Sequence, residues 1–358
     1  MGTGGGEEGS RDILPMKGLR PIHGRDACAT GTLAHSQTAK IRIAGLNDCF
    51  CRRMKTKSHV PLRGVLPVIP TPFHANGEVD EKGLRAVVDF AIAGGAGGVC
   101  SPMFASEFYK LSEEEIRAVT RIVVEQTRGR VPVIAQCNHT SLRGVIARAR
   151  YAESVGADWV GVLVPCAFPI KPQDVERFYL EICKNTRLPV IAQDADYAGG
   201  VLPPEVLVRL CRKTNNFRGI KLEGALNGPK FQMLRKETRG QLALTSGWAG
   251  LDIFDAVSRG VDGVVPSTAM IKTYVQCWNA FKKGDRPKGF RALAAFMPLA
   301  NFGMQNLELL HAIEKYLLVR QGVIACDHVR EPTLNIDAGY RRQIEQMADY
   351  YFKARAKI

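Results

Sequence analysis

The chain has 358 residues, of which 46% are hydrophobic and 23% are charged, and its formal net charge is +14. This composition is typical of a globular protein with one large α/β domain or two small ones, and no apolar run approaches the ~18 residues of a membrane-spanning helix. The basic residues are scattered along helices without a nucleic-acid motif. We therefore expect no nucleic-acid partner, no membrane association, and a surface that attracts acidic small molecules.

Residues 1–60 differ from the rest of the chain. They contain ten basic and five acidic residues, begin with a glycine-rich stretch, and show neither helical nor strand periodicity. We expect this segment to be disordered, or to be translated from an upstream start with Met54 as the true initiator. A transit peptide is the alternative.

The ten cysteines are spread through the chain, and none forms a CxxC pair. This spacing argues against a zinc site and against a disulfide framework. Because unpaired thiols persist in a reducing compartment, we expect the protein to be cytoplasmic.

From Leu62 onward, short apolar runs alternate with amphipathic segments of helical length. Helix starts are marked by Asp80, by Ser112 in a capping box with Glu115, by Thr140, and by prolines at 203 and 204. Eight runs have the length and composition of strands: Gly64–Ile69, Gly98–Ser101, Val131–Ala135, Trp159–Val164, Pro189–Gln193, Gly219–Leu222, Leu242–Thr245 and Gly263–Val265.

Near-continuous apolar strands that alternate with helices indicate a parallel sheet covered by helices. With eight such repeats, closure into a (β/α)8 TIM barrel is the economical solution. Three more helical segments follow the eighth strand: Lys288–Phe302, Leu307–Arg320 and Ala338–Ala356. We therefore predict an α/β fold with a barrel over residues 61–285 and a C-terminal helical extension over residues 286–358.

The strand candidate at Gly219–Leu222 carries a lysine, Lys221, near its end. Chemistry in such barrels occurs at the C-terminal ends of the strands. A lysine amine that is desolvated there loses its preference for the charged form and can attack a carbonyl to form a Schiff base. A surface lysine at a strand end is the alternative interpretation of this residue alone.

The order and content of several motifs resemble the dihydrodipicolinate synthase and N-acetylneuraminate lyase family of Schiff-base-forming barrels. The resemblance covers nearly the whole chain after Leu62. The motifs that carry it are Gly64–Phe73, Asn76–Asp80, Glu107 with Leu111–Glu115, Ala152–Asp158, Gly219–Lys221 and Gly263–Val265.

The resemblance implies a metal-independent and cofactor-free lyase, an aldolase or dehydratase, that acts on pyruvate or a longer 2-oxo acid. It implies that Lys221 condenses with the keto group and that Val265, in the last strand, contributes to the substrate pocket. Relatives are commonly oligomers, so a homo-oligomer, a dimer or a tetramer, is also expected.

One departure from the family pattern concerns proton transfer. Relatives usually carry a tyrosine at the end of strand five, where this chain has Gln193 followed by Asp194. Because an amide does not titrate, the proton relay has to come from Asp194, Asp196, Tyr197 or a water molecule. We therefore assign Gln193 and Asp194, with Lys221, to the candidate catalytic group.

A further departure concerns the substrate carboxylate. Relatives hold it with two adjacent hydroxyl residues after strand two, where this chain has Phe104 and Ala105. The backbone amide of Ala105 remains a possible donor, and Ser101 or Ser106 are substitutes for the missing hydroxyls. We include Phe104, Ala105 and Ser106 among the candidate substrate-binding residues.

The sequence leaves other functions open. The Gln193–Asp194 pair resembles the branch with sugar-acid dehydratases that act on 2-keto-3-deoxy-arabonate. The lost tyrosine and hydroxyls also fit a catalytically silent protein that binds a keto acid. A metal- or phosphate-dependent barrel is disfavoured, because clustered metal ligands and a glycine-rich phosphate loop are missing from the sequence.

Overall fold

The computed structural model describes residues 60–165, 170–195 and 202–358. All of them belong to one unit of the chain, Thr56–Ile358. The prediction for residues 1–60 therefore concerns a segment that, apart from Val60, lies outside the described residues. In the described ranges, we find no helix that is both long and apolar enough to cross a membrane.

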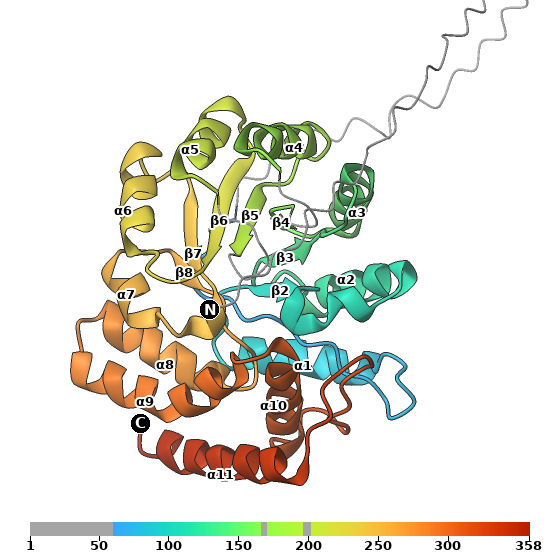
Figure 1. The fold of residues 1–358 in the computed structure, drawn as a ribbon, viewed down its shortest axis with the longest axis vertical. Coiled ribbons are helices and arrows are strands. Elements are labelled where there is room, and N and C mark those ends of the chain that lie inside the picture. The colour runs from blue at the N-terminus through green and yellow to red at the C-terminus, as the bar shows by residue number, and fades with distance from the viewer. Residues whose placement is uncertain (1–59, 166–169, 196–201) are drawn as a thin grey trace, which may run out of the picture. The chain divides into compact units, whose positions relative to one another are not determined.

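Eight parallel strands form the centre of this unit (Figure 1). Their order is β1-β8-β7-β6-β5-β4-β3-β2, and single bridges from Val68 to Cys100 and to Ser267 extend the pairing of the first strand region to both neighbours. The predicted TIM barrel is thereby confirmed. The strands are β1 (Gly64–Val65), β2 (Val99–Ser101), β3 (Val133–Gln136), β4 (Trp159–Leu163), β5 (Val190–Ala195), β6 (Phe217–Glu223), β7 (Ala243–Ser246) and β8 (Gly263–Val264).

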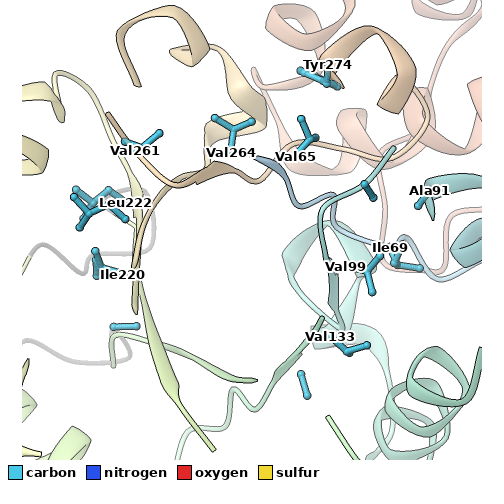
Figure 2. Close-up of a cluster of buried hydrophobic side chains, with 14 of the residues drawn as sticks. Val65, Ile69, Ala91, Val99, Val133, Ile220, Leu222, Val261, Val264 and Tyr274 are labelled. Atoms are coloured by element: carbon cyan, nitrogen blue, oxygen red, sulfur yellow. The ribbon is translucent and has the colours of Figure 1, made fainter. Parts of the chain in front are cut away.

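Side chains alternate between the two faces of each strand, so the barrel has two apolar regions. One faces the helices, and Figure 2 shows Val65 and Val264 directed toward the helix that carries Tyr274. The other fills the inside of the barrel with residues such as Leu66 and Ile134. Because both faces are apolar, the strand sequences are almost continuously hydrophobic, and this is why they could be predicted.

Helices follow the strands and cover the outside of the barrel (Figure 1). Asp80 accepts a hydrogen bond from the Gly83 amide, and Ser112 forms the predicted capping box with Glu115. The helices that follow the strands are α1 (Glu81–Ala93), α2 (Glu113–Thr127), α3 (Leu142–Val155), α4 (Pro172–Lys184), α5 (Pro204–Lys213), α6 (Gly228–Glu237), α7 (Ile253–Ser258) and α8 (Ile271–Lys282).

One predicted cap is displaced by a residue. The side chain that caps α3 is Ser141, which accepts from the Gly144 amide, and not Thr140. Both residues have a hydroxyl, and only the backbone conformation decides which one sits at the helix start.

The three predicted C-terminal helices are present as α9 (Arg286–Gly303), α10 (Leu307–Arg320) and α11 (Ala338–Arg355). Helix α9 packs against α8, α10 and α11, and α10 also contacts the turn at Phe104–Ser106. The extension therefore reaches the end of the barrel at which β2 stops.

Candidate active site

Lys221 lies inside the barrel on β6, and its side chain is only 4% exposed. Its amine is 2.7 Å from Oε1 of Glu223 and 3.8 Å from the sulfur of Met103. It also lines a pocket with Phe104, Trp248 and other residues. The structure thus places this lysine in a cavity and not on the surface of the barrel.

Glu223 is the residue that the sequence analysis missed. It follows Lys221 by two positions on β6, so both side chains point to the same face of the strand. Gln193 donates to its Oε2 at 2.5 Å, and the amide of Trp248 donates to its Oε1 at 3.4 Å. The Lys-x-Glu spacing on a predicted strand could have identified this carboxylate.

A glycine at position 247 makes room for this carboxylate. A Cβ atom built on Gly247 would lie 2.3 Å from Oε1 of Glu223 and 2.4 Å from its Cγ. Any larger residue would therefore push the carboxylate away from its position beside the Lys221 amine.

Gln193 belongs to a chain of amide hydrogen bonds inside the barrel. It pairs in register with Lys221 across β5 and β6. Its Oε1 accepts from Nε2 of Gln136 at 2.8 Å, and the same nitrogen also donates to Asn138 at 2.9 Å. Because amides do not titrate, this chain orients Glu223 without storing a proton.

Asp194 is directed away from this group. It follows Gln193 on β5 and accordingly points to the other face, where its carboxylate pairs with Lys230 at 2.6 Å. Both of its oxygens also accept from the amide of Leu202, at 3.0 and 3.1 Å. The structure gives Asp194 a role in anchoring Leu202, and we leave it out of the catalytic group.

The remaining predicted substrate residues separate into two sets. Phe104, Ala105 and Val265 line the pocket that contains the Lys221 amine. Ser106 does not line it, because its hydroxyl donates to the carbonyl of Ile69 at 2.5 Å and accepts from a backbone amide at 3.0 Å. Ser106 therefore holds the turn that carries Phe104 and Ala105.

The pocket has a cavity volume of about 40 Å³. Its described lining comes from the segment after β1, from the ends of β2, β6, β7 and β8, from the end of α9 and from the start of α10. The lining residues are Val68, Met103, Phe104, Ala105, Lys221, Glu223, Trp248, Ala249, Val265, Pro266, Ser267, Met304, Leu307 and Leu310.

Cys100 lies close to Lys221 in the barrel interior but is not a candidate nucleophile. Complete burial raises the pKa of its thiol to about 12, although the Lys221 charge acts in the opposite direction. A thiolate is the reactive form of cysteine, so this side chain is unreactive near neutral pH.

A buried cluster of charges supports the turn beside the pocket. Glu107, fully buried and with a left-handed φ of 57°, pairs with Lys315 of α10 and, at 3.0 Å, with Lys110. Burial lowers the pKa of Lys315 to about 8, and the neighbouring Glu107 charge limits this fall. The amide of Arg330 also donates to Glu107 at 3.2 Å. These contacts join the C-terminal extension to the β2 end of the barrel.

Asp196 and Tyr197, the possible proton relays, lie outside the described residues. His139 lines a second pocket with Phe108 and accepts from the Ser141 amide at 2.9 Å. Within the described ranges, no cluster of three or more His, Cys, Asp or Glu side chains has the geometry to hold a metal ion.

A sequence model of the dihydrodipicolinate synthetase family matches residues 61–350. The chain belongs to this family. An L-2-keto-3-deoxyarabonate dehydratase of Azospirillum brasilense is 28% identical over 303 residues, which are 82% of this chain and 96% of that protein. A 4-hydroxy-tetrahydrodipicolinate synthase of Methanopyrus kandleri is 30% identical over 244 residues, which are 66% of this chain and 80% of that protein.

Solved structures show the same fold. A dihydrodipicolinate synthase from Rhodopseudomonas palustris aligns with a TM-score of 0.76 at 21% identity, over 80% of this chain and 97% of that one. YagE of Escherichia coli K12 in complex with pyruvate aligns with a TM-score of 0.75 at 22% identity, over 81% and 98%. The chain is thus a divergent member of this family, whose members are lyases.

Proposed function

We propose that this protein is a class I lyase in which Lys221 forms a Schiff base with pyruvate or a longer 2-oxo acid. The observation that carries the proposal is the pairing of the buried Lys221 amine with the Glu223 carboxylate at 2.7 Å. A nucleophile next to a general base is the arrangement that carbonyl condensation requires.

In the first step, Nζ of Lys221 attacks C2 of the keto acid, and the C2 oxygen leaves as water. Glu223 takes a proton from the amine and returns one to the departing oxygen. The iminium then draws electrons from the neighbouring bonds. For a 4-hydroxy-2-oxo acid, Glu223 removes the hydroxyl proton, the C3–C4 bond breaks, and an aldehyde and an enamine form.

The enamine is then protonated at C3, and water releases pyruvate from Lys221. In a dehydratase the same carboxylate instead takes the C3 proton and assists departure of the C4 hydroxyl as water. Both routes need one titratable group beside the imine, and the position of Glu223 supports that role. Gln193 acts as a positioning residue, because it donates to the carboxylate and cannot itself exchange a proton.

The substrate carboxylate binds at the turn after β2 in this proposal. Phe104 and Ala105 lie there in the short 3-10 helix η1 (Phe104–Ser106), where relatives carry hydroxyls. The backbone amide of Ala105 supplies a hydrogen bond that does not depend on its side chain. Phe104 and Val265 enclose the methylene carbons of the substrate.

The Schiff base itself serves as the electron sink, so the proposed reaction needs no metal or organic cofactor. We also propose a homo-oligomer, as the family resemblance suggests, and a cytoplasmic location, as the unpaired cysteines suggest. The catalytically silent alternative is less favoured because the lysine and the carboxylate lie in contact within a pocket.

Reduction with borohydride in the presence of pyruvate tests the proposal. We expect a stable mass increase on the peptide that contains Lys221, and loss of both adduct and lyase activity in Lys221→Ala. The exposed Lys236→Ala serves as the matched lysine control and should retain both. Full turnover by Lys221→Ala would contradict the mechanism, and loss of activity on treatment with a chelator would contradict its metal independence.

A further inference from the structure

The described lining of the pocket around Lys221 contains few polar side chains and many apolar ones. Lys221, Glu223 and Ser267 are the described lining residues with polar side chains, apart from the indole of Trp248. The large apolar side chains Phe104, Trp248, Met304, Leu307 and Leu310 also line it, and we refer to these five as the apolar wall. Three of these five come from the end of α9 and the start of α10, and not from the barrel.

This apolar wall limits the chemical groups that a substrate can carry at the end remote from its carboxylate. We take the carbons beyond those that Glu223 reaches to extend toward this wall when Lys221 holds C2. A hydroxyl or amide placed there loses its bonds to water and finds no side-chain partner on Met304, Leu307 or Leu310. An alkyl or aryl group at the same position gains from leaving water.

The wall is fixed in place by the buried charges described above. Glu308, the residue after Leu307, pairs with Lys110 at 2.5 Å. Lys315, about two turns further along α10 than Glu308, pairs with Glu107. Both partners belong to the turn region that also carries Phe104. The apolar residues of α10 are therefore held over the pocket by ion pairs on two sides.

We propose that the natural substrates are 2-oxo acids whose end remote from the carboxylate is alkyl or aryl, and that Leu307 and Leu310 of α10 determine this preference. The inference rests on the proposed function, because it assumes that C2 is held by Lys221. It also separates this protein from a dehydratase for polyhydroxylated sugar acids, whose substrates carry hydroxyls along the chain.

The test compares two 2-oxo acids of similar size and shape. 4-Methyl-2-oxopentanoate ends in an isopropyl group, and 2-oxosuccinamate ends in a carboxamide. For each, the concentration that half-saturates borohydride trapping on Lys221 is measured, with pyruvate as the reference. We expect the isopropyl compound to half-saturate at a concentration on the order of 10- to 100-fold lower.

The ratio of the half-saturating concentration of 2-oxosuccinamate to that of 4-methyl-2-oxopentanoate measures the preference. In Leu307→Asn this ratio should fall by about tenfold, because the new amide offers a partner to the carboxamide and removes apolar surface. Val319→Asn, a partly buried position on the same helix that does not line the pocket, should leave the ratio unchanged. Circular dichroism confirms that both variants are folded, and Leu307→Met provides an apolar replacement if Leu307→Asn unfolds; it should keep the wild-type ratio.

A failure of the proposed function gives a different result from a failure of the inferred substrate preference. If pyruvate gives no adduct on Lys221, the proposed function itself is wrong. If pyruvate reacts but the carboxamide compound binds as well as or better than the isopropyl compound, the proposed function survives and the inference is overturned. The inference is also overturned if pyruvate reacts and neither longer acid does, or if Leu307→Met changes the ratio as much as a polar residue.

Discussion

The sequence pointed to Lys221 as a candidate site residue but did not point to Glu223. The lysine was predicted because it ends an apolar strand candidate within a recognisable motif, and the structure places it inside the barrel at 4% exposure. Glu223 lies two residues further along the chain and was given no role, although residues two apart on a strand share a face. Its importance depends on Gln193 and Gly247, which are distant in sequence, and no local pattern shows their proximity.

The first residue-scale prediction concerns Glu223. We expect Glu223→Gln to lower kcat by about 10²- to 10⁴-fold, because a general acid–base is removed while the shape of the side chain is kept. Borohydride trapping of pyruvate on Lys221 should still occur at a reduced rate, since the amine remains in place.

Steady-state turnover and peptide mass mapping measure these two effects separately. The exposed Glu205→Gln on α5 is the matched control and should behave like the unmodified protein. Undiminished kcat in Glu223→Gln would remove this carboxylate from the mechanism, and Gln193 would then need a different interpretation.

At the scale of elements, local sequence patterns predicted the helices well because caps are local. Helix α10 was predicted with the bounds that the structure shows, and the capping box of α2 is present. The α3 cap shows the limit of such local patterns. Thr140 and Ser141 both carry a hydroxyl, and the backbone conformation determines that Ser141 caps the helix. The role of α10 in the pocket was not predictable, because it depends on pairs such as Glu107–Lys315, which are 208 residues apart.

A double-mutant cycle tests how strongly α10 is joined to the turn after β2. We expect Glu107→Gln and Lys315→Met each to lower the free energy of unfolding by about 3–5 kcal/mol, because each leaves a buried charge without its main partner. The double variant should lose less than the sum of the two single losses, because neither charge is then left behind.

Urea unfolding provides the measurement. The ion pair between Arg320 and Asp349 is partly exposed to solvent, so Asp349→Asn is a suitable control and should cost at most about 1 kcal/mol. Strict additivity of the Glu107 and Lys315 losses would mean that the two side chains do not stabilise each other.

For the whole molecule, the barrel follows from the repeat of eight apolar strands, and the sequence was sufficient to predict it. Interior charges were harder to anticipate. His311 on α10 is almost fully buried, close to Tyr109, with its Nε2 3.1 Å from the tyrosine hydroxyl. Burial lowers the pKa of His311 from 6.5 to about 4, although the Glu107 and Glu308 charges act in the opposite direction.

This shift links stability to pH. Between pH 6.5 and 4 the unfolded chain binds a proton at His311 and the folded protein does not, so folding becomes less favourable as the pH falls. Relative to His311→Gln, the unmodified protein should lose about 1.4 kcal/mol per pH unit in this window, or about 3 kcal/mol in total.

Unfolding in urea at pH 7, 5.5 and 4.5 measures the difference between the two proteins. Burial of Glu314 raises its pKa to about 7 and produces a pH dependence of the opposite sign. Because both proteins contain Glu314, its effect cancels in the comparison. Parallel pH curves for the two proteins would show that His311 is not kept neutral by the fold.

The pairing of Glu107 with Lys315 also has a consequence for synthesis of the chain. All eight strands leave the ribosome before α10 does, so a nascent barrel can close while the carboxylate of Glu107 still lacks the amine that neutralises it. Until Lys315 arrives, the apolar residues of α10 are also missing from the pocket. The growing chain therefore has Lys221 in place well before it has Leu307 and Leu310, which complete the described lining of the pocket.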